Sequence, residues 1–311
     1  MHPVQRAISF KIGHFRSPCF RSSVPKRRPL SHPPSTEATT IVAGVELPCG
    51  RFDALWADHF AMRYPPHFHD TWAIGVVEEG LLQLRTARGE WVGGPGTILA
   101  FAPGEIHSAA ALSASGYRYR MVYPSVELIR GISTSESAAA SDRPFQVPVF
   151  TDHELAGKLV TAHQPLIDGQ WDTEVESRLV RTLRSLWKNR STTPRDEPHA
   201  PSDLHAVECA RDYLGTRFSR QVRLASIAAE CGLSSFQLIR VFQRVLGVSP
   251  YAYVVQLRVN RARDLLHQGV GVSEVAYTCG FSDQSHLTRV FKRAVGIPPG
   301  TYQRAVRERA A

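Results

Sequence analysis

The sequence lacks the features of exported and membrane proteins. No apolar run reaches the length of about 18 residues that a membrane-spanning helix needs. Charged residues and Pro18 interrupt the first 21 residues before the apolar core of a signal peptide could form. The five cysteines are odd in number and include no C-x-x-C pair, which argues against a disulfide framework and a cysteine-based zinc site. We therefore expect a cytoplasmic protein without membrane contact.

Positive charge is concentrated at the two ends of the chain. The net charge of +9 divides into +6 over residues 1–40, −4 over residues 41–202 and +7 over residues 203–311. A length of 311 residues suits two domains, each able to bury a core. A basic C-terminal block next to an acidic middle indicates that only the C-terminal part binds a polyanion.

Composition and periodicity suggest the domain boundaries. Residues 1–40 are rich in proline, serine and arginine, so we expect a disordered basic tail. Short apolar runs separated by turn signals between residues 42 and 123 indicate a β-sandwich or barrel. Apolar residues then recur at helical spacing over 152–190. We place a sensing domain at 41–190, a polar, proline-rich linker at 191–202 and a helical domain at 203–311.

The C-terminal block contains an internal repeat. Residues 224–253 match residues 272–302, and a single inserted residue changes the offset from 48 to 49. Each copy contains a short apolar helix, a turn glycine (Gly232 or Gly280), a serine that can cap the next helix, and a second helix. In the first copy Ser234 and Gln237 have the spacing of a capping box. This order is typical of a helix-turn-helix, so we predict two such units.

Apolar spacing orients the second helix of each unit. The residues predicted to face inward are Leu238, Val241, Phe242 and Val245 in the first unit and Leu287, Val290, Phe291 and Ala294 in the second. Arg240 and Arg289 then point outward at equivalent positions, where arginine can donate two hydrogen bonds to guanine. Pro250 begins a further helix that runs to about Leu266 and spans roughly 25 Å. Such a strut could place the two reading helices in adjacent major grooves, about 34 Å apart.

The repeat, and GFSDQSHLTRVFKRAVGIPPGTY in particular, resembles the DNA-binding module of AraC/XylS-family regulators. The resemblance implies an all-α double helix-turn-helix domain that binds double-stranded promoter DNA. It places base contacts at Phe236, Ile239 and Arg240 in the first reading helix and at Ser285, His286 and Arg289 in the second, although Ile239 offers no hydrogen bond. The helical phase adds four further outward-facing candidates, Gln243, Arg244, Thr288 and Lys292. Of these, we expect Arg244 and Lys292 to contact phosphates.

Two motifs in the first half resemble those of a cupin-like sensing domain. They are PPHFHDTWAIGVVEEG at 65–80 and GGPGTILAFAPGEIH at 93–107. Cupin enzymes hold a metal with histidines and a glutamate from these motifs, and here Ala73 stands at the glutamate position. The resemblance implies a β-barrel with flanking helices and a cavity for an organic effector. We therefore expect no metal and no cofactor. The alternative is that the three histidines hold a zinc ion. The candidate effector residues, each of which could instead be an ordinary core residue, are His67, His69, Trp72, His107 and Tyr119.

These inferences predict an α+β protein of two domains, a cupin-like barrel followed by an all-α double helix-turn-helix domain. We expect an effector-controlled transcription regulator rather than an enzyme, with RNA polymerase as a further candidate partner. A leucine stripe at Leu179, Leu183 and Leu186 favours a homodimer seam over packing on the barrel. Two alternatives remain: a metal-dependent cupin enzyme, such as a dioxygenase, fused to a DNA-binding module, and an architectural DNA binder that responds to no ligand.

Overall fold

A computed structural model describes residues 39–47, 50–59, 63–132, 145, 147–190 and 200–307. These residues belong to one compact unit, Thr36–Ala311. Nearly all of the expected tail and residues 191–199 of the expected linker lie outside the described residues. The first described strand begins at Thr39, and the helical domain begins at Pro201, two residues before the predicted start.

The N-terminal domain consists of two antiparallel sheets. The six-stranded sheet has the order β1 (Thr39–Leu47), β2 (Gly50–His59), β9 (Tyr117–Tyr123), β4 (Ala73–Gly80), β7 (Thr97–Phe101) and β10 (Val149–Thr151). The four-stranded sheet has the order β3 (Arg63–His67), β8 (His107–Ala111), β5 (Leu82–Thr86) and β6 (Gly89–Gly93). Because side chains alternate along a strand, Leu55 and Ala57 of β2 enter the core between the sheets, while Phe52 and Ala54 pack against helices.

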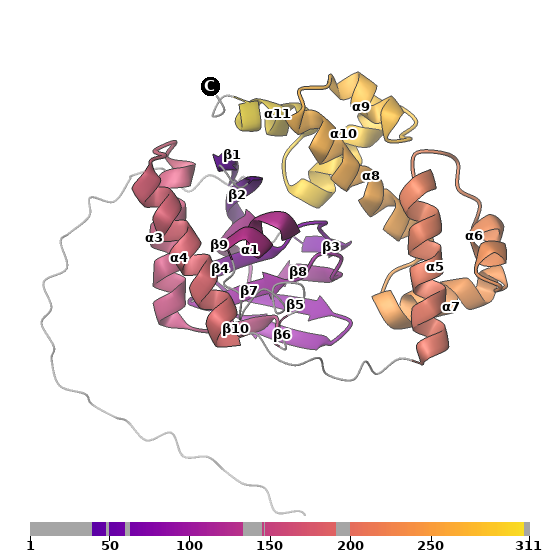
Figure 1. The fold of residues 1–311 in the computed structure, drawn as a ribbon, viewed down its shortest axis with the longest axis horizontal. Helices are drawn as coiled ribbons and strands as arrows, with labels where there is room; N and C mark the ends of the chain where they lie inside the picture. The colour runs from indigo at the N-terminus through magenta and orange to yellow at the C-terminus, as the bar shows by residue number, and fades with distance from the viewer. Residues whose placement is uncertain are drawn as a thin grey trace, which may run out of the picture. The chain divides into compact units, whose positions relative to one another are not determined.

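Three helices among the described residues accompany the sheets: α1 (Val126–Ile132), α3 (His153–Ile167) and α4 (Thr173–Arg190). In Figure 1, α3 and α4 run side by side next to the strands. The side chains of Leu179, Leu183 and Leu186 are only 1–2% exposed, because they pack into the core that α3 and α4 share with the six-stranded sheet. The prediction of a dimer seam at this stripe is therefore wrong, and the alternative, packing on the barrel, is what the structure shows.

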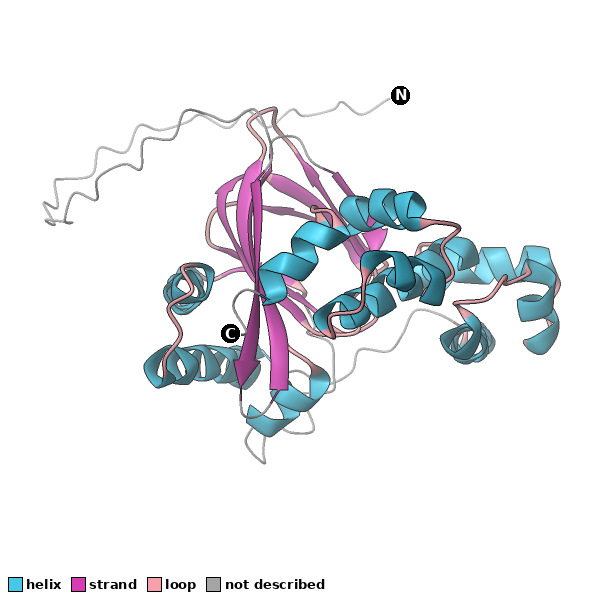
Figure 2. Cartoon of the chain, turned by 90° about the horizontal axis from the view of Figure 1, so that it is seen from above, coloured by secondary structure: helices cyan, strands magenta, loops and turns pink. Residues whose placement is uncertain are grey.

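The C-terminal domain is entirely helical in the described range (Figure 2). Its helices are α5 (Pro201–Arg217), α6 (Leu224–Glu230), α7 (Ser235–Leu246), α8 (Pro250–His267), α9 (Val272–Thr278), α10 (Gln284–Val295) and α11 (Pro299–Arg307). Helix α7 begins with the predicted capping box, in which Ser234 and Gln237 bond to each other's backbone N–H. Helix α8 begins at Pro250, as predicted, and Ser249 caps it.

The second unit differs from the first at the cap of its reading helix. Asp283, rather than the repeated Ser282, caps α10 by accepting a hydrogen bond from the backbone N–H of His286 at 2.7 Å. The residue inserted into this copy moves the start of the helix by one position, so the serine does not reach the cap. Ser282 instead contacts the side chains of Asp283 and His286.

The predicted inward residues form the cores of the two helix-turn-helix units. All four residues of the first unit and Leu287 and Phe291 of the second are buried, whereas Val290 and Ala294 are half-buried. Cys279 is fully buried, whereas its counterpart in the first unit, Cys231, is only half-buried. None of the described helices combines the length and apolar character that crossing a bilayer requires.

Candidate DNA-binding surface and effector cavity

The outward faces of α7 and α10 carry the predicted reading residues. Phe236 is 68% exposed, and the guanidinium carbon of Arg240 lies 5.6 Å from the centre of the Phe236 ring, within cation–π range. Arg289 is exposed at the equivalent place on α10. The remaining predicted residues are exposed or half-buried: Ile239, Gln243, Ser285, His286, Thr288 and Lys292. Each reading helix therefore presents an exposed to half-buried face that carries one arginine at the same helical phase.

Arg244, predicted to contact phosphate, forms an ion pair within the domain. Its Nη1 lies 2.7 Å from Oδ2 of Asp203 on α5. The Arg244 side chain is 53% exposed, so it can contact solvent and its partner together. An exposed pair of this kind contributes little to stability, and contact with DNA would require Arg244 to be shared with Asp203 or released from it.

A groove of about 1130 Å³ lies between the two helix-turn-helix units. Ile239 of α7 and His286 of α10 both line it, so the reading helices flank one depression. Tyr251 and Tyr277, which were not predicted as site residues, also line the groove and are 68% and 87% exposed. The repeat gave no signal for Tyr277, because Ala229 stands at the same place in the first copy.

A second hollow, a cavity of about 60 Å³, lies between the sheets of the barrel. Its lining is mainly apolar and aromatic and includes three histidines and five tyrosines. Four lining residues come from the helical domain: Arg263 of α8, Ala294 and Val295 of α10, and Tyr302 of α11. The barrel supplies Asp53, Leu55, Tyr64, His67, His69, Leu82, Leu84, Leu99, Phe101, His107, Ala109, Tyr117, Tyr119, Met121 and Tyr123. The two domains therefore build this cavity together.

The three cavity histidines are brought together by strand register. His67 at the end of β3 pairs directly with His107 at the start of β8, and His69 follows two residues after His67. The ring centres of His67 and His107 are 4.3 Å apart, and that of His69 lies 5.1 Å from the first and 5.3 Å from the second. Burial lowers the pKa of all three, that of His67 to about 4, so the rings are neutral at pH 7.

Two predicted effector residues lie in different places. Tyr119 lines the cavity, and its hydroxyl donates to the Tyr64 hydroxyl at 3.0 Å. Trp72 does not line the cavity: it is fully buried on the helical side of the sheet, with its ring centre 5.0 Å from that of Trp187. The sequence shows Trp72 near the histidines, but it directly precedes β4 and packs with Ile74 on the helical side, whereas Ala73 between them enters the core between the sheets. Ala73, at the glutamate position of the resemblance, is fully buried in β4.

A buried polar cluster connects the cavity wall to the helical domain; we call Asp53, Arg263, His267 and Tyr302 the interdomain cluster. Arg263 Nη2 and His267 Nε2, both on α8, lie 2.9 Å and 2.7 Å from the two carboxylate oxygens of Asp53 on β2. The Tyr302 hydroxyl donates to the same carboxylate. Although burial alone would raise the pKa of Asp53, the hydrogen bond from His267 and the charge of Arg263 hold it well below its usual value.

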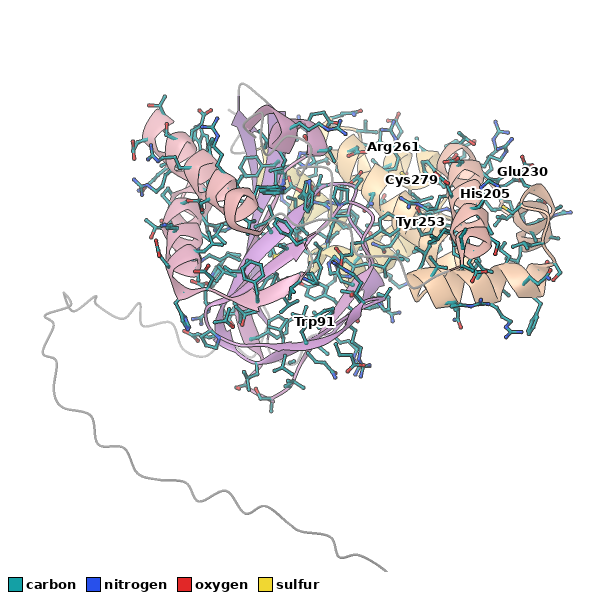
Figure 3. The ribbon with its side chains drawn as sticks, turned by 60° about the horizontal axis from the view of Figure 1, so that its bottom comes forward. Trp91, His205, Glu230, Tyr253, Arg261 and Cys279 are labelled. Carbon is teal, nitrogen blue, oxygen red and sulfur yellow. The ribbon has the colours of Figure 1, made fainter. Side chains whose placement is uncertain are left out.

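Arg263 also reaches the histidines. Its Nη1 lies 3.3 Å from Nδ1 of His69, and its guanidinium carbon lies 5.1 Å from the centre of the Tyr123 ring. A neighbouring contact is apolar: Phe68, between His67 and His69, stacks on Tyr253 of α8 with ring centres 4.8 Å apart. Figure 3 labels Tyr253 among the helices of the C-terminal domain. The helix that joins the two DNA-binding units therefore rests on the histidine end of the cavity.

The geometry defines a DNA-binding double helix-turn-helix domain joined to a barrel with an internal cavity, and the comparisons agree. Residues 53–183 match the AraC-like ligand binding domain family, and residues 227–305 match a helix-turn-helix domain family. The chain belongs to the AraC-type transcription regulators.

Individual relatives match over most of their length. An HTH-type transcriptional regulator of Bacillus subtilis, YbfI, is 30% identical over 227 residues, covering 72% of this chain and 82% of the relative. The arabinose operon regulatory protein of Escherichia coli is 26% identical, covering 71% of this chain and 76% of the relative. The crystal structure of an apo ToxT variant from Vibrio cholerae matches 88% of this chain and 98% of that chain with a TM-score of 0.50 at 14% identity, which shows a shared fold.

Proposed function

We propose that this chain is a sequence-specific regulator whose binding to promoter DNA is controlled by a small-molecule effector in the barrel cavity. The observation that carries the proposal is the shared cavity wall, because α8, α10 and α11 contribute to it directly. Helix α8 joins the two helix-turn-helix units, and α10 is the second reading helix. A ligand in the cavity would therefore touch the elements that position the DNA-reading surface.

The size of the cavity suggests how control would operate. A space of about 60 Å³ holds a few water molecules, whereas sites for organic ligands commonly measure roughly 300–1,000 Å³. A sugar-sized effector would enter only if the wall moved outward. The movable part of the wall is the helical one, since the strands are fixed by their ladders of hydrogen bonds. Binding of such an effector would thus shift the helical domain relative to the barrel.

DNA reading can be tested by selecting binding sites from random double-stranded DNA with the full-length protein. We expect a bipartite footprint, with Arg240 and Arg289 each reading one half. Arg240→Ala and Arg289→Ala should each cost about 1–3 kcal/mol of specific binding and relax selection in one half only. Arg261→Ala is a matched control, because this exposed arginine lies on α8 and pairs only weakly with Asp264 at 3.9 Å. Unchanged discrimination in both reading variants would contradict the assignment.

Effector control can be tested with variants of one strand. Ala109 lines the cavity, whereas Ala110, the next residue of β8, is equally half-buried and points to the other face. A metabolite panel would first be screened by thermal shift on the full-length protein, since a bound ligand raises the melting temperature. Ala109→Leu should abolish both the shift and any change in DNA affinity, and Ala110→Leu should retain both. A response that survives Ala109→Leu would place the effector elsewhere.

A homodimer and contact with RNA polymerase remain part of the proposal. With the α4 leucines buried inside the chain, a dimer would use a different surface. Light scattering of the full-length protein with and without DNA tests the stoichiometry.

A further inference from the structure

We propose that His67, His69 and His107 bind one divalent transition-metal ion, and that metal binding displaces Arg263 from the barrel. The regulatory half of this inference rests on the proposed function; the coordination itself does not. It departs from the sequence-based expectation of a metal-free cavity, because the fold brings together three rings that the sequence separates by up to 40 residues.

Backbone carbonyls fix the orientation of two of the three rings. Nδ1 of His67 lies 2.8 Å from the carbonyl oxygen of Pro65, and Nδ1 of His107 lies 2.9 Å from that of Glu105. A carbonyl can only accept, so each Nδ1 carries the hydrogen and each Nε2 keeps its lone pair. Among the described residues neither Nε2 has a hydrogen-bond partner. This arrangement is the usual support for a metal-binding histidine, whose second nitrogen donates to an oxygen.

The spacing of the rings suits a single ion. One ligand nitrogen from each histidine lies within 4.8 Å of the other two. Rings that share an ion through nitrogens at 2.0–2.1 Å have centres roughly 4.5–5.2 Å apart, depending on whether the angle at the metal is about 90° or 109°. The observed separations of 4.3, 5.1 and 5.3 Å bracket this range. Phe101 stacks on His107 with ring centres 4.0 Å apart, which holds that ring plane in place.

The donor set selects the class of ion. Three neutral imidazoles without a carboxylate favour zinc, cobalt, nickel or copper over magnesium and calcium, which need oxygen ligands. The adjoining space holds a few water molecules, enough to complete the coordination shell without opening the cavity. A metal ion therefore fits the cavity as it stands, unlike a sugar-sized ligand.

Arg263 and the metal compete for His69. Guanidinium nitrogens only donate, so in the contact at 3.3 Å Nδ1 of His69 accepts and Nε2 carries the hydrogen. To bind through Nε2, His69 must change tautomer, and the favourable contact with Arg263 is then lost. The positive charge of Arg263 also opposes a nearby cation. Binding of the ion should consequently weaken the attachment of α8 to the barrel, and by reciprocity loss of Arg263 should strengthen metal binding.

Cobalt(II) titration of the full-length protein tests the site, because its visible absorption reports both stoichiometry and ligand type. We expect one equivalent per chain, without the near-ultraviolet charge-transfer band that thiolate ligands produce. His69→Gln and His107→Asn should each weaken binding by roughly tenfold or more. His163→Gln is the matched control, since His163 is equally buried but lies on α3 outside the cluster. Circular dichroism of each variant verifies that it folds.

The competition is tested by Arg263→Gln, which should raise cobalt affinity by at least about tenfold. The site would be overturned if neither the wild type nor Arg263→Gln bound cobalt stoichiometrically. It would also be overturned if binding survived in both histidine variants. Equal affinity of wild type and Arg263→Gln would overturn the competition. These measurements use no DNA, so their failure leaves effector control by an organic ligand standing. An altered DNA footprint that requires the metal and disappears in His107→Asn would connect the site to regulation.

Discussion

The two turn glycines of the DNA-binding domain offer a sharp test of the structure. Gly232 and Gly280 occupy the same place in the repeat, and both adopt a left-handed backbone, with φ of 66° and 77°. Their surroundings differ. A Cβ atom on Gly232 would meet nothing within 4 Å, whereas one on Gly280 would lie 2.1 Å from the carbonyl oxygen of Ser219, in the loop between α5 and α6. The second turn therefore packs directly on the backbone of the loop that precedes the first unit.

The expected costs follow from these contacts. Alanine in a left-handed conformation costs about 1–2 kcal/mol at either position. At Gly280 the new methyl group must also move a backbone carbonyl by more than about 1 Å, which adds about 1–3 kcal/mol, typical of an overpacked site. We therefore expect Gly280→Ala to lower the free energy of unfolding by about 2–5 kcal/mol and Gly232→Ala by about 1–2 kcal/mol.

Urea denaturation monitored by far-ultraviolet circular dichroism is the appropriate assay. The five tryptophans all lie between residues 56 and 187, so tryptophan fluorescence would not report on the helical domain. Hydrogen exchange of peptides from α6 and α9 would assign the loss to a unit. Equal destabilisation by the two substitutions would show that the Ser219 contact does not exist, and the reasoning would fail.

Two further predictions concern buried charge and protonation. Asp53→Asn should leave Arg263, whose side chain is only 12% exposed, without its carboxylate, at a cost of about 3–5 kcal/mol to the contact between barrel and helical domain. Hydrogen exchange in residues 250–307 should therefore become faster. The control is Asp58→Asn on the same strand, because the half-exposed pair of Asp58 with Arg118 contributes about 1 kcal/mol or less. Equal effects of the two substitutions would refute a special role for Asp53. Burial lowers the pKa of His163 to about 3. When the pH falls below the ordinary histidine pKa of about 6.5, this residue therefore takes up a proton in the unfolded chain but not in the folded chain. As the pH is lowered from 7.5 to 5.5, the free energy of unfolding should therefore fall by roughly 1 kcal/mol more in the wild type than in His163→Gln. Parallel curves of unfolding free energy against pH for the two proteins would contradict this.

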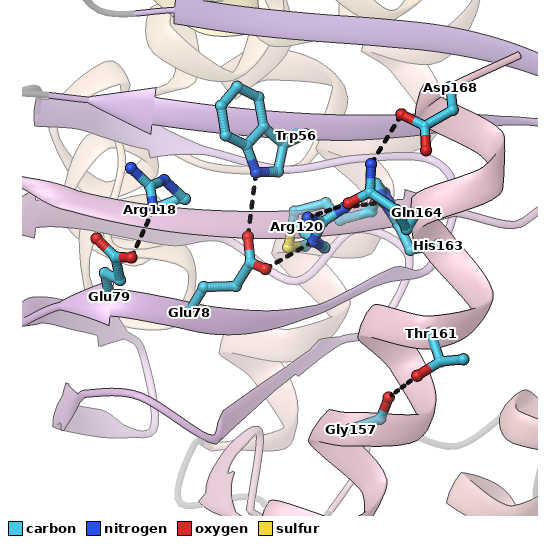
Figure 4. A network of polar contacts seen from close by, with 11 residues as sticks. Trp56, Glu78, Glu79, Arg118, Arg120, Gly157, Thr161, His163, Gln164 and Asp168 are labelled. Carbon is cyan, nitrogen blue, oxygen red and sulfur yellow. Dashed lines mark hydrogen bonds and ion pairs between the residues drawn. The ribbon is translucent and has the colours of Figure 1, made fainter. Parts of the chain in front are cut away.

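The His163 prediction also depends on a polar network that packing creates (Figure 4). Arg120 of β9 forms an ion pair with Glu78 at 2.9 Å and donates to Gln164 at 2.7 Å, next to His163. Burial is the main reason why the pKa of His163 is low, and the positive charge of Arg120 lowers it further. The residues lie on β4, β9 and α3, separated along the chain by 42 to 86 positions. No local pattern predicts such a cluster, since only the packing of α3 against the sheet brings its members together.

Local rules predicted the elements that depend on neighbouring residues. The apolar period of helix α7 and its capping box, and the start of α8 at Pro250, were all predicted from short stretches of neighbouring residues and are confirmed. The same rules failed where one residue changed the phase, as at the Asp283 cap. They also failed where a pattern suited two partners equally: the leucine stripe of α4 could face a second copy or the barrel, and periodicity does not distinguish the two.

By itself the sequence determined the family, the order of the two domains and the outward faces of the reading helices, because repeats and periodicity are recorded in adjacent residues. Tertiary structure alone decided that Trp72 leaves the cavity, that Gly232 and Gly280 differ, and that Arg263 joins Asp53 to His69. These relations depend on strand register and on the contact between two domains. Side chains about 200 residues apart come within hydrogen-bonding distance there, and no short-range pattern specifies that meeting.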